Sequence, residues 1–142
     1  MQIDYLVLAD AVAVADGKHY IHGGGWDTLF AATFPAHHPA LGVAVRLRIP
    51  WEETNQQFAL EVDVLLEGEE HRSIFPEPLR GIVNAARPLN IPPDSDLPLH
   101  MALGLANLQF DEPGLYTVVL RIDGQPVAES PFSVVAVPQH PE

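Results

Sequence analysis

The chain has 142 residues, which fits a single domain and is long enough to bury a core of its own. Its net charge of −12, from 19 acidic and 7 basic residues, repels phosphate groups, so we expect neither a nucleic acid nor a membrane as a partner. The chain contains no cysteine, which excludes disulfides and thiolate chemistry and suits a cytoplasmic protein.

Prolines and glycines interrupt the chain at short intervals, and no segment shows the apolar stripe of an amphipathic helix. Short strands with frequent turn signals are typical of an all-β sandwich or barrel. We predict a two-sheet antiparallel β-sandwich of immunoglobulin-like type with seven to nine strands. We expect one domain over residues 1–137, followed by a frayed tail over residues 138–142.

The first part of the chain predicts a central strand and a hairpin. Residues 3–8 are apolar on both faces of the expected strand, which indicates a position in the middle of a sheet. Residues 11–15 and 18–22 flank the dipeptide Asp16-Gly17. Asp-Gly between two apolar runs predicts a hairpin, because both turn positions need a positive φ.

The clearest alternation of apolar and polar residues lies in the middle of the chain. Residues 41–49 and 58–66 each alternate as a strand with one buried face does. We predict that these two strands pair antiparallel across the loop of residues 50–57, with Arg46 opposite Glu61. Such exposed cross-strand ion pairs stabilise a sheet by roughly 0.2–1 kcal/mol and help to set its register.

The last third predicts a bulged strand and a closing hairpin. In residues 99–110 the apolar positions change from odd to even, which predicts a β-bulge near Ala106-Asn107. Residues 116–122 alternate regularly before an Asp123-Gly124 turn, as in the closing hairpin of an immunoglobulin-like sandwich. Pro131 interrupts the final strand, which predicts a bulge or an edge position there.

The expected core consists mainly of aliphatic residues from these alternating strands, with two aromatic residues from the last hairpin. The predicted core residues are Leu6, Leu8, Val43, Val45, Leu47, Leu60, Val62, Val64, Leu103, Tyr116, Val118, Leu120, Phe132 and Val134.

The first candidate interaction loop consists of Gly23, Gly24, Gly25, Trp26 and Asp27. Three glycines allow unusual backbone conformations and the close approach of another chain, and Trp26 adds a large aromatic surface. The loop lacks the glycine spacing of a phosphate-binding loop. The alternative is a structural corner at which Trp26 covers the core.

The second candidate interaction loop contains Trp51, Glu52, Glu53 and Asn55, directly after Pro50. An aromatic residue beside acidic residues can bind a basic or sugar-like ligand. The alternative is that Trp51 covers the open end of the core.

No pattern for catalysis or for a cofactor is present. The seven histidines lack the usual zinc spacings, and the acidic pairs Asp94/Asp96 and Asp111/Glu112 lack the rest of a calcium loop. No serine lies in a nucleophile-elbow motif. We therefore expect no enzyme, no catalytic residue, no metal and no cofactor.

We favour a non-catalytic module that binds a protein partner or self-associates. A cation- or small-ligand-binding domain that uses acidic loops and histidines is the alternative.

Two segments are distinctive: Gly-Gly-Gly-Trp at residues 23–26 and Pro-Trp-Glu-Glu-Thr-Asn at residues 50–55. Together with the hairpin of residues 110–137, they resemble a family of small uncharacterised bacterial proteins, mostly from actinobacteria. This resemblance implies a bacterial, cytoplasmic protein and carries no activity or cofactor. The first residues also lack the basic segment of a secretory signal, and no apolar run reaches the ~18 residues of a membrane span.

Overall fold

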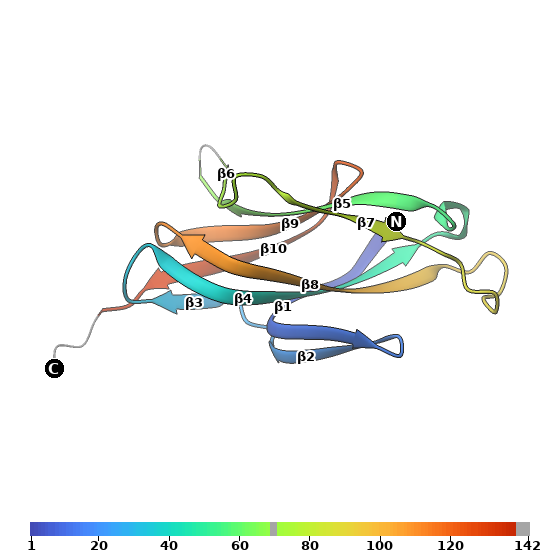
Figure 1. The fold of residues 1–142 in the computed structure, drawn as a ribbon, viewed down its shortest axis with the longest axis horizontal. Coiled ribbons are helices and arrows are strands. Elements are labelled where there is room, and N and C mark those ends of the chain that lie inside the picture. Colours follow the sequence, from blue (N-terminus) through green and yellow to red (C-terminus); the bar gives the residue numbers. More distant parts are fainter. Residues whose placement is uncertain (69–70, 139–142) are drawn as a thin grey trace.

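A computed structural model describes residues 1–68 and 71–138, so most of the predicted tail, residues 139–142, lies outside the described residues. The described residues form ten strands and one short 3-10 helix, arranged in two packed sheets (Figure 1). The predicted all-β, two-sheet architecture is confirmed. The number of strands exceeds the predicted seven to nine. No helix in the described part of the chain is long and apolar enough to cross a membrane.

The first sheet is antiparallel and has the strand order β2-β1-β4-β8. Its strands are β1 (Gln2–Ala15), β2 (Lys18–Gly24), β4 (Ala36–Ile49) and β8 (Leu97–Phe110). The predicted hairpin is confirmed, with φ of 53° at Asp16 and 69° at Gly17. The two predicted strands before this turn form one continuous strand, β1, which lies between β2 and β4 as expected.

The β1–β2 hairpin, residues 10–24, lies on the outer face of the first sheet. β1 pairs with β4 as far as Ala9 and from there onward pairs with β2. Val12 then crosses over Gly42, and a Cβ built on Gly42 would lie 2.9 Å from the Val12 Cγ2 atom. Ala44, on the same outer face, is fully buried. In Figure 1 the hairpin forms a third layer below β4 and β8, away from β5 and β9.

The second sheet has the strand order β3-β10-β9-β5-β6, and β7 pairs with the same edge of β5 as β6 does. Its strands are β3 (Thr28–Ala31), β5 (Gln57–Leu66), β6 (Arg72–Ser73), β7 (Leu79–Asn84), β9 (Gly114–Ile122) and β10 (Gln125–Ala136). β3 runs parallel to β10, so this sheet is mixed and the prediction of a fully antiparallel sandwich is wrong at this pair.

The predicted pairing of the two middle strands is also wrong. β4 lies between β1 and β8, whereas β5 lies in the other sheet between β9 and β7. The Arg46 guanidinium bonds to Asp4 instead of Glu61, and Glu61 lies opposite Arg121. The connection between β4 and β5 contains the 3-10 helix η1 (Trp51–Glu53) and crosses from one sheet to the other.

In β8 the buried positions change from odd to even as predicted, but the pairing of β8 with β4 does not shift in register. Leu105 and Leu108 are both buried, and Asn107 between them has a φ of 56°. β4 changes phase at the same place, since His38 and then Leu41 face the core. The pairing between the two strands therefore keeps one register throughout, and the predicted bulge is absent from this ladder.

Pro131 lies in a partly unpaired stretch of β10. The strand pairs with β3 only from Ser133 onward, so the predicted edge position of Pro131 agrees with the described pairing. Pro131 itself lies regularly opposite Thr117, and the register shift falls between Pro126 and Ala128 instead. A predicted bulge at Pro131 is thus wrong.

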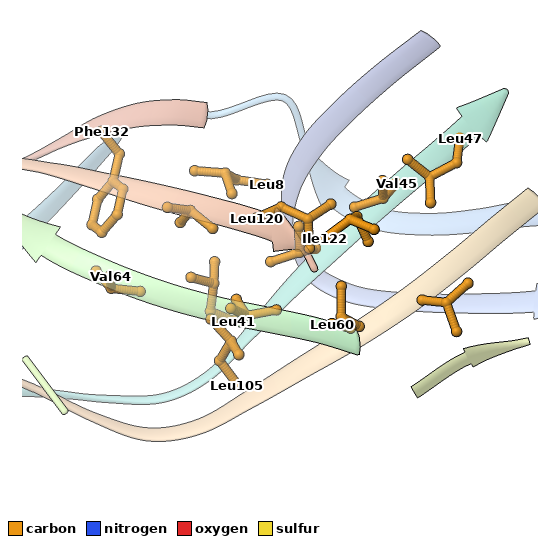
Figure 2. Packing of buried hydrophobic residues seen from close by; sticks show 14 of the residues in the cluster. Leu8, Leu41, Val45, Leu47, Leu60, Val64, Leu105, Leu120, Ile122 and Phe132 are labelled. Carbon is orange, nitrogen blue, oxygen red and sulfur yellow. The ribbon is translucent and has the colours of Figure 1, made fainter. Parts of the chain in front are cut away.

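The core fills the space between the two sheets, where side chains from both meet (Figure 2). All of the predicted core residues are buried except Leu6 and Leu103, which pack against the core but remain partly exposed. Three aromatic rings fill the end near β3, with ring centroids 4.9 Å apart for Phe110 and Tyr116 and 5.8 Å apart for Tyr116 and Phe132.

Candidate interaction edge and groove

The three consecutive glycines form the corner at which the chain leaves β2. Gly23 and Gly25 have φ values of 60° and 85°, a region that favours glycine, and the Gly25 N–H donates to the Leu8 carbonyl at 2.9 Å. Gly24 has no room for a side chain, because a Cβ there would lie 2.4 Å from the Ile21 Cγ2 atom. Each glycine therefore has a local structural use.

Trp26 and Asp27 bind the corner to the second sheet. The half-buried Trp26 ring packs edge-to-face on Phe132 and His38, with centroids 6.4 and 6.2 Å away. Its Nε1 atom is buried and finds no hydrogen-bond partner among the described residues. The Asp27 carbonyl accepts from the Ser133 N–H at 2.8 Å, and its exposed carboxylate accepts from Thr28 at 3.0 Å.

The second predicted loop is held by Arg87, which sequence reasoning missed. The guanidinium carbon lies 3.4 Å from the centroid of the Trp51 ring. The same guanidinium donates to the Trp51 carbonyl at 3.0 Å and to the Thr54 hydroxyl at 2.9 Å. The Arg87 N–H donates to the Asn55 side chain at 2.9 Å, and Asn55 has a φ of 59°. Glu52 is exposed and Glu53 is partly exposed.

The structure does not bring the two predicted loops together. Trp26 packs on His38 near the start of β4, whereas Trp51 follows the last residue of that 14-residue strand. The loops therefore lie at opposite ends of the sandwich. Among the described residues, no three His, Asp or Glu side chains gather as a metal site would require.

The most exposed interaction feature is the outer edge of β8. The strand is 14 residues long, contains no charged residue, and forms one edge of the first sheet. A free strand edge offers unpaired backbone groups to another chain, and proteins normally protect it with charge, proline or shortness. β8 has one proline, Pro98, near its start. The other edge strands are protected: β2 carries Lys18, β7 carries Arg80, and β3 and β6 are short.

An apolar hollow of about 230 Å³, the edge groove, lies between β8 and β7 of the second sheet. A Cβ at Gly81 would meet only Leu60, at 4.0 Å, and one at Gly104 would meet nothing within 4 Å. The missing side chain of Gly81 thus leaves the groove open. Its lining consists of Leu60, Val62, Leu79, Arg80, Gly81, Ala102, Leu103, Gly104 and Leu105.

The other side of β8 is also accessible at the same place. A second hollow of about 320 Å³ lies between β8, β4 and the β1–β2 hairpin, and residues 103–106 of β8 line it. This part of β8 is therefore approachable from both sides. The absence of charge in residues 97–110 is visible in the sequence, but it does not distinguish an edge strand from an interior strand.

His19 of the β1–β2 hairpin contacts β8 and is itself contacted by Tyr5 of β1. The Tyr5 hydroxyl lies 2.5 Å from the His19 Nδ1 atom, and the His19 Nε2 atom lies 2.9 Å from the Met101 carbonyl oxygen. The His19 and His100 rings pack edge-to-face with centroids 4.9 Å apart. Burial lowers the pKa of His100 below its ordinary value, and the neighbouring His19 and Arg46 lower it further.

The fold and the edge together define a two-sheet β-sandwich protein with one long, uncharged strand edge beside an open apolar groove. The chain belongs to the Family of unknown function (DUF6941), whose family model matches residues 4–135. The expected membership of an uncharacterised family is thereby confirmed.

Comparison with other known proteins adds no function. No curated protein matches the chain significantly. One solved structure is similar, the Pseudomonas fluorescens alkylpurine DNA glycosylase AlkC bound to DNA containing an abasic site analog. The identity is 10% and the TM-score 0.48, over 95% of this chain and 30% of that chain. The chain thus spans less than a third of that protein, and the likeness carries no argument about function.

Proposed function

We propose that this protein is a non-catalytic module that self-associates by pairing β8 of one copy with β8 of a second copy. The observation that carries this proposal is the 14-residue edge of β8, which has no charged residue. Two such edges that pair antiparallel form one continuous sheet across a two-fold axis, and this closes both edges at once.

The side-chain pattern of β8 suits pairing with itself. Leu99, Met101 and Leu103 face the core, while Ala102 and Gly104 lie on the opposite face of the strand. In a register that brings Leu103 of the two copies together, core-facing residues meet core-facing residues and small residues meet small residues. The edge groove then receives apolar side chains of the second copy.

Charge supports the choice of β8 over the other edges. Each copy carries a net charge of −12, so two copies repel one another at long range. Like charges placed directly opposite each other in a sheet destabilise the pair. β8 is the long edge at which two copies can approach without such pairs.

Two finer aspects of the proposal have separate support. For the immunoglobulin-like character, the Tyr116 hydroxyl donates to the Glu112 carbonyl four residues upstream, at 2.6 Å, as in the tyrosine corner of such sandwiches. Burial raises the pKa of this hydroxyl, which keeps the donor protonated. We propose a cytoplasmic location because the sequence is free of cysteine, and a bacterial source because residues 23–26 and 50–55 resemble a family of bacterial proteins.

The test is the concentration dependence of sedimentation for the wild type and for an edge variant. The edge variant carries Ala102→Glu and Gly104→Glu, and in the proposed register positions 102 and 104 of the two copies face each other. Each of the two facing pairs of like charges costs about 1 kcal/mol at ~5 Å even in water. The dimer should therefore weaken at least about tenfold.

The matched control carries Gln57→Glu and Gln125→Glu, which add the same charge at two exposed positions in the second sheet. This control should dimerise like the wild type, apart from a small general repulsion. A wild type that remains monomeric up to about 300 µM, a concentration at which even weak specific pairs form, would overturn the proposal. Equal weakening in the edge and control variants would overturn it as well.

Small-ligand binding is a second candidate function, which a polar hollow of about 300 Å³ at one end of the sandwich supports. Arg72, Ser73, Gln109 and Asp111 contribute polar groups to its lining, beside Leu66, Ile74 and Tyr116. Calorimetry with Ca²⁺, Zn²⁺ and small dicarboxylates tests this candidate. An absence of heat at ~1 mM, where even weak complexes form, would remove it.

A further inference from the structure

The β1–β2 hairpin is a third layer with a limited hold on the sandwich. Beyond Ala9 it pairs with itself and no longer with β4. Its apolar residues divide between two surroundings, since Val12 packs on Gly42 while Val14 and Tyr20 are exposed. The glycine corner at its end supplies the backbone freedom that a hinge needs.

The polar contact between the hairpin and β8 runs through the His19 ring. The Met101 carbonyl can only accept, so the His19 Nε2 atom must donate to it. The His19 Nδ1 atom then accepts from the Tyr5 hydroxyl when the ring is neutral. This arrangement keeps a carbonyl of β8 occupied by the hairpin.

The cluster contains few compensating negative charges for an added proton. His100 of β8 packs against His19 of β2, with Tyr5 of β1 on the other side of His19. Arg46 of β4 lies opposite His100 in the ladder and is itself bonded to Asp4 of β1. A proton on His100 therefore places a positive charge next to the Arg46 guanidinium. The same charge lies next to the His19 ring, which already donates a hydrogen bond to β8.

We propose that the β1–β2 hairpin is a cover over β8, which opens when His100 becomes protonated and thereby frees the Met101 carbonyl for pairing with a second copy. The second half of this inference rests on the proposed function, whereas the opening itself does not.

The direction of the pH effect follows from linkage. The pKa of His100 is lower in the closed state than the value of about 6.5 that an exposed histidine has. The open state thus binds the proton more tightly. The closed hairpin is favoured fully above pH ~6.5 and progressively less as the pH falls below that value toward the pKa of the closed state.

Hydrogen exchange on the monomer at about 1 µM measures opening independently of association, since dilution disfavours any dimer. Amides of residues 10–24 should exchange at least about threefold faster at pH ~5.5 than at pH ~7.5, after correction for intrinsic rates and relative to β9. His100→Gln should abolish this difference. The matched control, His22→Gln, removes an exposed histidine of the hairpin and should keep the difference.

Sedimentation at the same two pH values then separates the two proposals. Tighter dimers at the lower pH in the wild type, and no such gain in His100→Gln, support both the cover and its link to β8. Faster exchange of the hairpin in a chain that stays monomeric supports the cover and overturns the pairing. Hairpin exchange that is the same at both pH values, or that changes equally in His100→Gln, overturns the cover.

Discussion

Replacing Arg87 by alanine should destabilise the protein by about 2–4 kcal/mol, even though Arg87 lies in a loop. The variant loses the cation–π contact with Trp51, worth about 0.5–1 kcal/mol at a partly exposed site. It also loses the hydrogen bonds from the guanidinium to the Thr54 hydroxyl and the Trp51 carbonyl, worth roughly 1.5–3 kcal/mol. Thr54 is buried, so water does not readily replace the lost donor.

Equilibrium unfolding in urea, followed by far-ultraviolet circular dichroism, measures this loss without depending on tryptophan fluorescence. Arg80→Ala is the matched control, because its side chain is 66% exposed and makes one ion pair, with Glu61 at 3.2 Å. The control should cost less than about 1 kcal/mol. If the free energy of unfolding of Arg87→Ala lies within about 0.5 kcal/mol of the wild-type value, Arg87 does not hold Trp51 in place. The loop that contains Trp51 would then again be a candidate interaction site.

Three further predictions concern other parts of the fold. Gly42→Ala places a Cβ 2.9 Å from the Val12 Cγ2 atom, so the rate of hydrogen exchange in the β1–β2 hairpin should rise. In the control Gly104→Ala, the new Cβ meets nothing within 4 Å, so the exchange rate of the hairpin should stay unchanged. Tyr116→Phe removes the hydrogen bond to the Glu112 carbonyl and should cost about 1 kcal/mol in urea unfolding; an unchanged midpoint would contradict the tyrosine corner. Raising the salt concentration should tighten the proposed dimer, as measured by sedimentation, because salt screens the repulsion between two chains of charge −12. Weaker association at higher salt would contradict pairing at an uncharged edge.

Alternation predicted most of the strands but could not choose their partners. In the sequence, the acidic face of β5 is complementary in charge to Arg46 in β4. The structure shows that Glu61 of the same face meets Arg121 and Arg80 instead. Several strands carried a suitable charge, so complementarity alone did not distinguish them. Adjacent position in the chain favoured the wrong choice, because a connection through a short 3-10 helix can join two sheets as well as two neighbouring strands.

The candidate site was harder to predict than the fold. An edge is a property of topology, and a charge-free strand such as β8 resembles an interior strand in sequence. The edge groove also lies between Gly81 of β7 and Leu103 of β8, which are far apart in the chain. Arg87 reaches Trp51 across 36 positions, a contact that no local pattern reveals. The aromatic loops were conspicuous in the sequence, but their aromatic rings are engaged inside the molecule.

The matched change of phase in β4 and β8 has a consequence for how these strands can vary. Each strand carries one residue outside the alternation, and the two residues, Pro39 and Asn107, lie opposite each other. Loss of one alone would leave one strand a residue longer than its partner and would break the common register of the ladder beyond this point. Loss of both together would restore the alternation of both strands at once. Insertions and deletions in this ladder should therefore be tolerated only when both strands change by the same number of residues. The two segments lie nearly seventy positions apart in the chain, yet their lengths must stay matched.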